Sequence, residues 1–525
     1  MIKSANMNRE KGFTFYLLAA SLLGMSFAFI VTFRYGAGLA TDGARYLSTV
    51  ENLINGEGFI EYLDVPLTQF PPIYSIIIAL IGFITEADVF VIAQYINILT
   101  FGSTIWMAGT FFRKLFPENI LYAYIGSGVF VTSVSLLRMA SNVLSDLMFL
   151  ALTIGFLSIT TTYIENPSRK NLFALGLLCA VSPLLRYAGL THILTASLVI
   201  LLIHRKERLK GILQAGIFGL LTSLPTLFWV YFHSYLQTGI LFGTRLPPNP
   251  EGNLVTTIEK AVHWFIPYSV TDRIPEWLII AILFLVLTTG NRVADWKNWG
   301  RQIANSKFLP SLIFLFFYVM VLIFNVSYSE VRWPFMDRIH IVILPSLMAI
   351  GFMTIRELLP FYLRRLSTRT LFTAVVTIFI LWLAYPLNGI QETLWSAYYN
   401  GETSEYNIYN TRAQNESGIR TFVASLPITS EDKIYSNYEP VAWLYTRHTI
   451  LKLPQGPVRP EPPDSEEVLQ NYPDWPGEHG AGYVIWMKEL GFKEYVLAPE
   501  QLTSKADFEL LFTSEQGDVY RITPK

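Results

Sequence analysis

The chain has 525 residues, of which 52% are hydrophobic and only 15% are charged. Soluble domains carry about 25% charged residues, so this composition excludes an ordinary soluble protein and indicates a membrane protein. The formal net charge of −1 excludes a strongly basic surface for nucleic acid. The single cysteine, Cys179, excludes an internal disulfide and a cysteine-based zinc site.

Apolar runs that approach the length of a membrane span recur through the first 390 residues. A helix needs about 20 mostly apolar residues to cross the hydrocarbon core. The runs are Phe13–Phe33, Val89–Phe112, Ile120–Leu137, Leu147–Tyr163, Leu172–Leu185, Tyr187–Ile203, Ile212–Phe232, Trp277–Thr289, Phe308–Val326, Ile339–Ile355 and Leu371–Leu387. They predict about eleven spans. A shorter run, Pro71–Ile84, opens with two prolines and either crosses obliquely or lies half-embedded.

Basic residues near the ends of these runs predict the orientation, because Lys and Arg favour the cytoplasmic side. The clusters are Lys3/Arg9/Lys11, Arg113/Lys114, Arg169/Lys170, His204–Lys210, Arg292–Lys307 and Arg364/Arg365/Arg369. All of them fall on one face if Pro71–Ile84 does not cross, whereas several change sides if it does. We therefore predict a half-embedded Pro71–Ile84, a cytoplasmic N-terminus and an extracytoplasmic C-terminus, in the plasma (inner) membrane.

The composition changes after the last run, and residues 391–525 are polar and rich in proline. Alternating apolar residues predict short strands at Lys433–Tyr438, Tyr495–Ala498 and Val519–Thr523. Trp486–Leu490 reads as the end of a helix stopped by Gly491. The predicted fold is mainly α: a polytopic bundle of membrane helices over residues 1–390, followed by a small extracytoplasmic α/β domain over residues 391–525.

Polar residues gather in the predicted outer loop after the first span. Asp42 lies close to the end of that span, and apolar residues recur at helical spacing in Arg45–Ile54, which predicts an amphipathic helix on the membrane surface. Gly56 and Gly58 are expected to end this helix. The loop closes with Gln69–Tyr74, which contains two consecutive prolines. Polar residues that converge in apolar surroundings call for a functional explanation.

These motifs resemble the GT-C superfamily of polyprenyl-phosphate-dependent glycosyltransferases, and most closely its branch of protein O-mannosyltransferases and aminoarabinose transferases. In the first loop the resemblance rests on Asp42, the aromatic-bearing helix, the glycine turn that ends in Phe59, and the Pro-Pro-x-Tyr motif that ends in Tyr74. It extends to Ser141–Asp146, Pro183–Gly189 and Arg332–Arg338, and so covers roughly the first 350 residues.

The resemblance implies that a sugar moves from a polyprenyl-phosphate donor to a protein, lipid or glycan acceptor on the extracytoplasmic side. It implies that Asp42 is the general base and that Asp146 is a second acidic site residue. The departing lipid phosphate is anionic, and the guanidinium fork of arginine suits it. The candidate phosphate ligands are Arg332, Arg338 and Arg186. The candidate substrate-binding residues are Arg45, Tyr46, Gln69, Tyr74 and Asn142.

Structural roles compete with each of these assignments. Asp42 could be a helix-capping or turn residue, and Asp146 could be the N-cap of the span that follows. The two arginines of the fourth outer loop could pair only with Glu330 and Asp337 or with lipid headgroups. Arg45 could snorkel beside its own helix, and the two tyrosines could pack at the membrane interface.

Two other functions stay open, a secondary transporter and a non-catalytic scaffold. Transporters usually carry acids near the bilayer midplane, whereas these runs are nearly free of charge at their centres. Because Asp42 is the single candidate base in the first loop, we predict an inverting single displacement. We expect no tightly bound metal, since Glu86 and Asp88 read more simply as a polar turn, although the sequence leaves a divalent cation open. The C-terminal domain is expected to bind or orient the acceptor.

Overall fold

Apolar segments in a bilayer must satisfy their backbone hydrogen bonds internally, so they form helices. In the computed structural model, each predicted run within the described residues is helical over most of its length. The structure describes residues 2–242, 253–271, 278, 306–328, 337–362, 367–429, 431–456, 465–472, 475–476, 482–488 and 496–525. The predicted run Trp277–Thr289 lies outside these residues, except for Leu278.

Residue contacts divide the chain into two compact units, and each unit combines distant parts of the sequence. Unit 1 comprises Met1–Val31, Thr68–Ile73 and Tyr95–Trp395. Unit 2 comprises Thr32–Leu67, Tyr74–Gln94 and Ser396–Lys525. The predicted first outer loop therefore belongs largely to the same unit as the C-terminal region.

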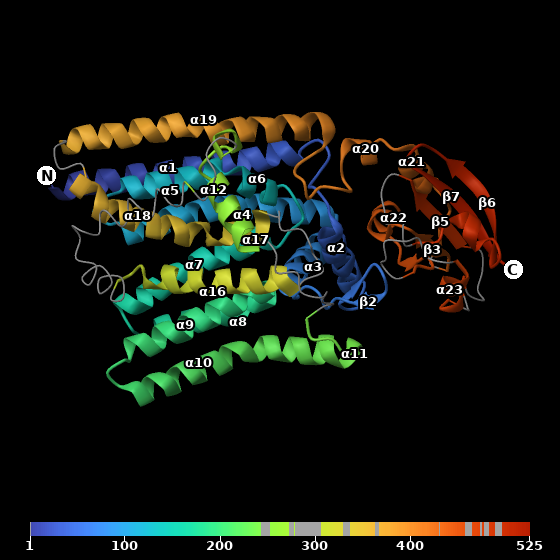
Figure 1. The fold of residues 1–525 in the computed structure, drawn as a ribbon, viewed down its shortest axis with the longest axis horizontal. Helices are drawn as coiled ribbons and strands as arrows, with labels where there is room; N and C mark the ends of the chain where they lie inside the picture. The colour runs from blue at the N-terminus through green and yellow to red at the C-terminus, as the bar shows by residue number, and fades with distance from the viewer. Residues whose placement is uncertain are drawn as a thin grey trace. The chain divides into compact units, whose positions relative to one another are not determined.

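Unit 1 is built from helices. They are all but the last residue of α1 (Ile2–Thr32), most of α4 (Val89–Leu115), α5 (Leu121–Thr132), α6 (Val134–Ala140), α7 (Asp146–Glu165), α8 (Arg169–Leu185), η1 (Tyr187–Gly189), α9 (Leu190–Ile203), α10 (Arg208–Trp229), η2 (Val230–Tyr235), α11 (Leu236–Thr238), α12 (Asn253–His263), α13 (Tyr268–Thr271), α16 (Leu309–Tyr328), α17 (Asp337–His340), η3 (Ile341–Ile343), α18 (Leu344–Tyr362) and most of α19 (Thr368–Asn400). Within this bundle α8 lies against α7, α9 and α10, and α16 lies against α7, α9 and α18 (Figure 1).

Several of these helices can cross a membrane. Six segments among the described residues are long and apolar enough: Arg9–Thr32, Val89–Leu115, Asp146–Glu165, Arg208–Thr238, Asp337–Glu357 and Phe372–Asn400. The pair α5 and α6, bent by 55°, counts as a further span if its members cross together. Tyr187–Ile203 and Leu309–Ile323 are apolar but shorter. The chain is thus a multi-pass membrane protein, and the larger predicted number of spans stays a prediction.

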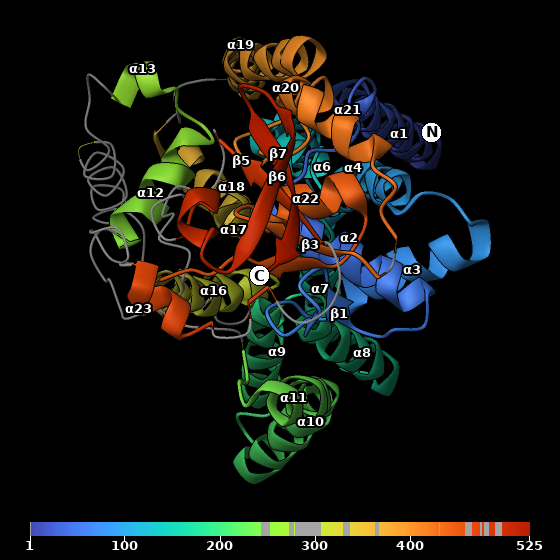
Figure 2. The ribbon, with the colours of Figure 1, turned by 90° about the vertical axis from the view of Figure 1, so that its right-hand side faces the viewer.

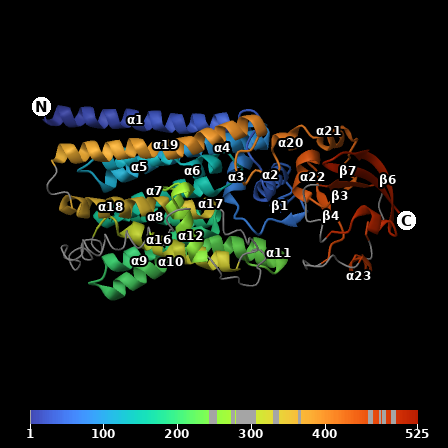
Figure 3. The same ribbon diagram turned by 45° about the horizontal axis from the view of Figure 1, so that its top comes forward.

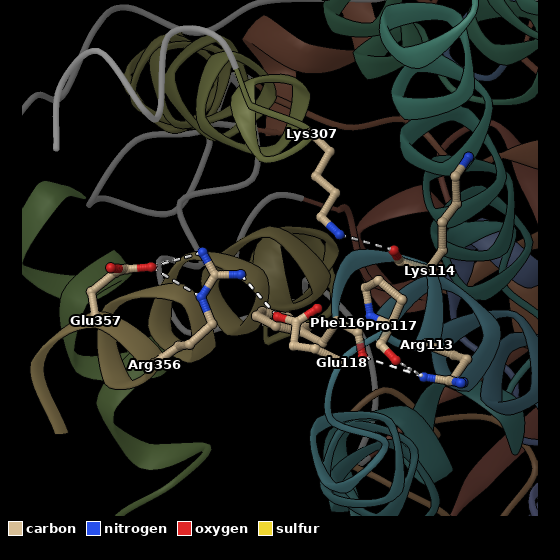
Figure 4. A network of polar contacts seen from close by, with 8 residues as sticks. All are labelled: Arg113, Lys114, Phe116, Pro117, Glu118, Lys307, Arg356 and Glu357. Atoms are coloured by element: carbon tan, nitrogen blue, oxygen red, sulfur yellow. Dashed lines mark hydrogen bonds and ion pairs between the residues drawn. The ribbon is translucent and has the colours of Figure 1, made fainter. Parts of the chain in front are cut away.

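Polar contacts join the helix ends around the predicted cytoplasmic cluster Arg113/Lys114 (Figure 4). Arg356 of α18 pairs with Glu118, in the turn between α4 and α5, at 3.0 Å. Lys307, just before α16, donates from Nζ to the carbonyl oxygen of Lys114 at 3.3 Å. Arg113 donates to the carbonyl oxygen of Pro117 at 2.8 Å. These basic side chains therefore bind neighbouring protein groups and hold this end of unit 1 together.

Unit 2 begins with α2 (Thr41–Ile54), a short hairpin of β1 (Ile60–Glu61) and β2 (Val65–Pro66), and all but the first residue of α3 (Ile73–Thr85). Helix α3 has 13 residues. One of its faces is buried through Tyr74, Ile78 and Gly82, while Leu80 and Phe83 are 58% and 71% exposed. An exposed apolar face on a helix this short suits a half-embedded segment, and that placement stays a prediction.

The C-terminal part of unit 2 folds around a five-stranded sheet (Figure 2). Its strands are β3 (Lys433–Ser436), β4 (Ile450–Lys452), β5 (Gly482–Met487), β6 (Ala506–Thr513) and β7 (Gly517–Pro524), in the order β4-β3-β5-β7-β6. The neighbours β4, β3 and β5 are parallel, and β7 is antiparallel to β5 and β6. The helices are α20 (Arg412–Asn415), α21 (Gly418–Ser425), α22 (Glu439–Thr446), α23 (Ser465–Gln470) and η4 (Pro499–Leu502).

The strand predictions are confirmed at Lys433–Tyr438 and Val519–Thr523, which overlap β3 and β7. The prediction at Tyr495–Ala498 is largely wrong, because its described residues form only an isolated bridge, from Val496 to Gln455. The helix end predicted at Trp486–Leu490 is also wrong where it is described, since Trp486 and Met487 belong to β5. This segment is buried between β3 and β7, and sheet pairing overrides local helix signals.

Candidate active site

Asp42 lies in the first turn of α2, where the helix N-terminus favours a carboxylate. The helix predicted over Arg45–Ile54 is confirmed, although it starts earlier, at Thr41, and Asn55 is its C-cap. Its placement on the membrane surface stays a prediction. Gly56 and Gly58 follow with φ of +83° and +93°, a backbone conformation that glycine adopts readily. The N-cap is Ala40, so Asp42 is not the capping residue.

Arg45, one turn after Asp42, pairs with Glu61 of β1. Its Nε lies 3.3 Å from Glu61 Oε2, and the Glu61 side chain is 7% exposed. Burial raises the pKa of the Glu61 carboxyl above its usual range, and Arg45 offsets part of this rise. Arg45 also interacts electrostatically with Asp42. This guanidinium is therefore held between carboxylates rather than snorkelling alone.

Tyr46 and Tyr74 pack against each other inside unit 2. Their rings meet edge to face with centroids 4.9 Å apart, and neither side chain is more than 1% exposed. Such burial favours the packing role over a sugar platform.

Asp88 accepts a hydrogen bond from the Phe90 backbone at 2.8 Å, so it caps the start of α4, as expected of a polar turn.

Asp146 and Arg186 form a buried ion pair in unit 1. Asp146 opens α7 and is 1% exposed. Arg186 Nη1 lies 2.7 Å from its Oδ2 and donates to Ser145 Oγ at 3.2 Å. Asp146 Oδ1 is buried and has no hydrogen-bond partner among the described residues. A guanidinium and a carboxylate therefore lie next to each other at the start of α7.

Arg186 is placed by a tight corner between α8 and α9. It adopts an extended conformation, with φ −150° and ψ 135°, and Gly189 follows in η1. A Cβ on Gly189 would lie 2.3 Å from the carbonyl carbon of Ser182, so the corner has no room for a side chain there. Tyr187 OH donates to the carbonyl oxygen of Thr68 at 3.2 Å, which brings the segment of Gln69 to this corner.

Arg338 lies on α17 and is 8% exposed. Its neighbour Asp337 accepts a hydrogen bond from Ser135 at 2.6 Å and lies 3.9 Å from Lys260 Nζ. Asp337 was expected to pair with the arginines of its own loop. The structure gives it further partners, on α6 and α12. Arg332 lies outside the described residues.

Tyr318 of α16 connects α17 to the ion pair. Its hydroxyl donates to the carbonyl oxygen of Ile339 at 3.0 Å and interacts electrostatically with Arg186 and Asp146. The residue next to Arg338 therefore lies near the Asp146–Arg186 pair.

Asn142 is 1% exposed, and its polar groups bind neighbouring parts of the protein. Its side-chain amide donates to the carbonyl oxygen of Arg138 at 2.6 Å, and its main-chain carbonyl oxygen accepts a hydrogen bond from the Asn97 side chain.

Among the described residues, no group of three or more His, Cys, Asp or Glu side chains is placed to hold a metal ion.

Comparison with solved structures finds similarity along nearly the whole chain. ArnT from Cupriavidus metallidurans bound to undecaprenyl phosphate aligns with a TM-score of 0.60 and 13% identity, over 97% of this chain and 98% of ArnT. The apo structure of ArnT aligns with a TM-score of 0.57 and 13% identity, over 98% of each chain. The Archaeoglobus fulgidus oligosaccharyltransferase tethered with an acceptor peptide aligns with a TM-score of 0.52 and 11% identity, over 90% of this chain and 69% of that chain.

The chain has the fold of ArnT.

This shared fold agrees with the resemblance inferred from the sequence motifs. No protein-family model and no curated protein matches the sequence, so the relationship rests on three-dimensional structure. Within this fold, Asp42, Arg45, Tyr46 and Tyr74 belong to unit 2. The other described site candidates belong to unit 1: Gln69, Asn142, Asp146, Arg186 and Arg338. That the two groups meet in one site stays a prediction.

Sequence reasoning missed several partners of the candidate residues. Glu61 sits in a two-residue strand and carries no motif, although it pairs with Arg45. Lys260 and Ser135 come from helices distant in sequence from Asp337. Nothing in the local sequence pointed to these partners, because residues separated in the sequence are brought together only when the chain folds.

Proposed function

We propose that this protein is a membrane glycosyltransferase that uses a polyprenyl-phosphate-linked sugar and acts on the extracytoplasmic side of the plasma membrane. The main support is the fold, which is shared with ArnT over nearly the whole length of both chains. ArnT was solved bound to undecaprenyl phosphate, and this lipid phosphate is the donor carrier that we propose here.

Asp42 is the proposed general base. An acceptor hydroxyl oxygen attacks the anomeric carbon of the sugar, and its proton passes to the Asp42 carboxylate. The bond between the anomeric carbon and the phosphate oxygen breaks, and the lipid phosphate leaves with the electron pair. One displacement at that carbon inverts its configuration. The position of Asp42 in the first turn of α2 supports this role, because the helix N-terminus stabilises the carboxylate.

Arg186 and Arg338 are the proposed ligands of the donor phosphate, together with Arg332. Arg186 already neutralises Asp146 at 2.7 Å. The buried Arg338 lies near this pair through Tyr318 and Ile339. Cationic forks in a site with little water stabilise a leaving phosphate far more than in bulk solvent.

Asp42→Asn tests the proposal. It removes the base but keeps the shape of the side chain, so transfer from undecaprenyl-phosphate sugars to a membrane extract of acceptors should fall at least about 100-fold. Binding of undecaprenyl phosphate should change little. Asp64→Asn is the matched control, because Asp64 is exposed on the β1–β2 turn with φ of +56°, which asparagine tolerates. Wild-type transfer by Asp42→Asn would remove Asp42 from the mechanism, and retention of anomeric configuration would exclude the single displacement.

A further inference from the structure

Residues 35–41 lead from α1 into the first residue of α2, and residues 35–40 are irregular. Irregular backbone cannot satisfy its own N–H and C=O groups, so it needs partners elsewhere. In unit 2 these partners come from residues 407–410, and Asn407 lies 368 positions after its partner Leu39. The segment just before Asp42 is therefore held by the segment that follows the last long helix.

Two asparagines bind the backbone of residues 35–41. Asn407 Oδ1 accepts the Leu39 N–H at 2.9 Å. Asn410 Nδ2 donates to the carbonyl oxygens of Tyr35 at 2.7 Å and Ala37 at 2.8 Å. Both asparagines are 6% exposed or less. Hydrogen bonds shielded from water in this way are costly to break.

The backbone of residues 407–410 adds to this contact. The N–H groups of Ile408 and Tyr409 both donate to the Leu39 carbonyl oxygen at 3.0 Å. Asn407 Nδ2 donates to the carbonyl oxygen of Gly401 at 2.7 Å. Gly401 follows α19 with φ of +68°, so the segment is anchored at the end of a long helix.

Tyr409 reaches the residue next to Asp42. Its side chain is 1% exposed, and its hydroxyl lies 2.7 Å from Thr41 Oγ1 and 3.2 Å from the Tyr438 hydroxyl. Burial raises the pKa of Tyr409 well above its usual range, so the hydroxyl keeps its proton. The Tyr409 ring also packs edge to face on Tyr438, with centroids 5.3 Å apart.

The body of α2 is held by the same part of the chain, because α2 packs against α22 (Figure 3). Arg447, which follows α22, pairs with Glu51 of α2 at 2.8 Å. Its guanidinium also lies over the Trp443 ring, 4.9 Å from the centroid. The start and the middle of α2 thus have separate attachments to the C-terminal region.

We propose that Asn407, Tyr409 and Asn410 are positioning residues for catalysis: they fix residues 35–41 and so orient the Asp42 carboxylate. The inference rests on the proposed function, in which Asp42 is the general base. A base displaced by about 1 Å can lose about 100-fold in rate. The C-terminal region then contributes to the chemical step through Thr41, in addition to any contact with the acceptor.

Tyr409→Phe and Thr41→Val test the hydroxyl contact from its two sides, and the double variant closes the cycle. The rate of transfer from undecaprenyl-phosphate sugars is divided by the number of sites that bind undecaprenyl phosphate, so unfolded protein does not count. Each single variant should lower this normalised kcat at least about 10-fold, with the donor KM within about two-fold. The double variant should be no slower than the slower single variant, because both remove one interaction.

Asn410→Asp is an independent variant, since its carboxylate cannot donate to the two carbonyl oxygens but can still accept from Asn415. Tyr398→Phe is the control, because this tyrosine is 50% exposed and the loss of its hydroxyl leaves the contact between Tyr409 and Thr41 intact, so the variant should keep the normalised kcat. Hydrogen–deuterium exchange of peptides within residues 35–44 should accelerate in Asn410→Asp and in Tyr409→Phe.

The outcomes separate the two proposals. If Asp42→Asn is inactive but Tyr409→Phe and Asn410→Asp keep the wild-type normalised kcat, the positioning role is overturned and the proposed base survives. Unchanged exchange in residues 35–44 also overturns it, since these side chains then do not hold the segment. If Asp42→Asn is fully active, the proposed function fails first, and the positioning role falls with it.

Discussion

Burial controls the protonation of Glu61, the partner of Arg45. The raised pKa of this carboxyl, caused mainly by burial, means that the folded protein binds the proton more tightly than the unfolded chain does. Its contribution to stability is therefore complete below the unfolded pKa, near 4.5. That contribution is lost as the pH rises through the higher folded-state pKa.

Glu61→Gln should reveal this dependence, because glutamine resembles the protonated acid at every pH. The Tm of the variant minus the Tm of the wild type should increase as the pH is raised from about 4 to about 7, measured by thermal unfolding in detergent. Asp64→Asn, at an exposed position on the same hairpin, serves as the control. A Tm difference that stays constant, or that favours the wild type at higher pH, would show that the ion pair with Arg45 outweighs burial.

Individual residues were predictable where a short motif carries the signal. Asp42 and Asp146 were chosen through the resemblance, as an acidic residue just after the first span and another at the start of a later span, and both lie in the first turn of a helix. The ion pair between Asp146 and Arg186 could not be predicted, although each residue was a candidate on its own. Forty positions separate them, and only the packing of α8 against α7 brings them together.

Helices were more predictable than strands in this chain. A membrane span needs a long apolar run, which is visible in sequence and forces helical hydrogen bonding. The strands of unit 2 are short. Whether such a segment forms a strand depends on the neighbouring strands that pair with it. Trp486 shows the difference, because its pairing with Asp518 of β7 decides its conformation and nothing in its local sequence excludes a helix.

The corner between α8 and α9 is an element that cannot accommodate a larger residue. Gly189→Ala would place a Cβ 2.3 Å from the carbonyl carbon of Ser182 and 2.5 Å from Pro183 N. Backbone atoms cannot swing aside as a flexible side chain can, so the corner has to open. We expect a loss of about 1–3 kcal/mol in stability and weaker binding of undecaprenyl phosphate, since Arg186 lies in the same corner.

Gly216→Ala is the matched control for this element, because a Cβ at Gly216 in α10 meets nothing within 4 Å. It should leave the Tm unchanged or slightly higher, as alanine favours a helix. Thermal unfolding and titration with undecaprenyl phosphate measure both effects. Equal behaviour of the two variants would show that the corner adapts and that Arg186 is not held by it.

At the scale of the whole molecule, the fold agrees with the resemblance seen in the motifs. The sequence did not show which distant segments of the chain pack into one compact unit. The chain was divided in prediction at residue 391, because composition changes there. In the folded chain, residues 32–67 and 74–94 form one compact unit with residues 396–525. Polar side chains such as Asn407 and Asn410 make that connection, and polar residues in a polar segment give no local signal of a distant partner.

The topology of the molecule is open to a direct test, because Cys179 is the single cysteine and is buried. In a Cys179→Ala background, Glu500→Cys and Lys210→Cys place single thiols at exposed positions. A membrane-impermeant maleimide added outside should label position 500 in intact cells, whereas position 210 should need permeabilised cells. The physical reason is the basic cluster His204–Lys210, since such clusters stay in the cytoplasm.

If Pro71–Ile84 crosses the membrane instead, position 210 moves outside and is labelled in intact cells. Labelling of position 500 only after permeabilisation would place residues 396–525 inside, away from an extracytoplasmic acceptor, and the proposed sidedness of the reaction would fail.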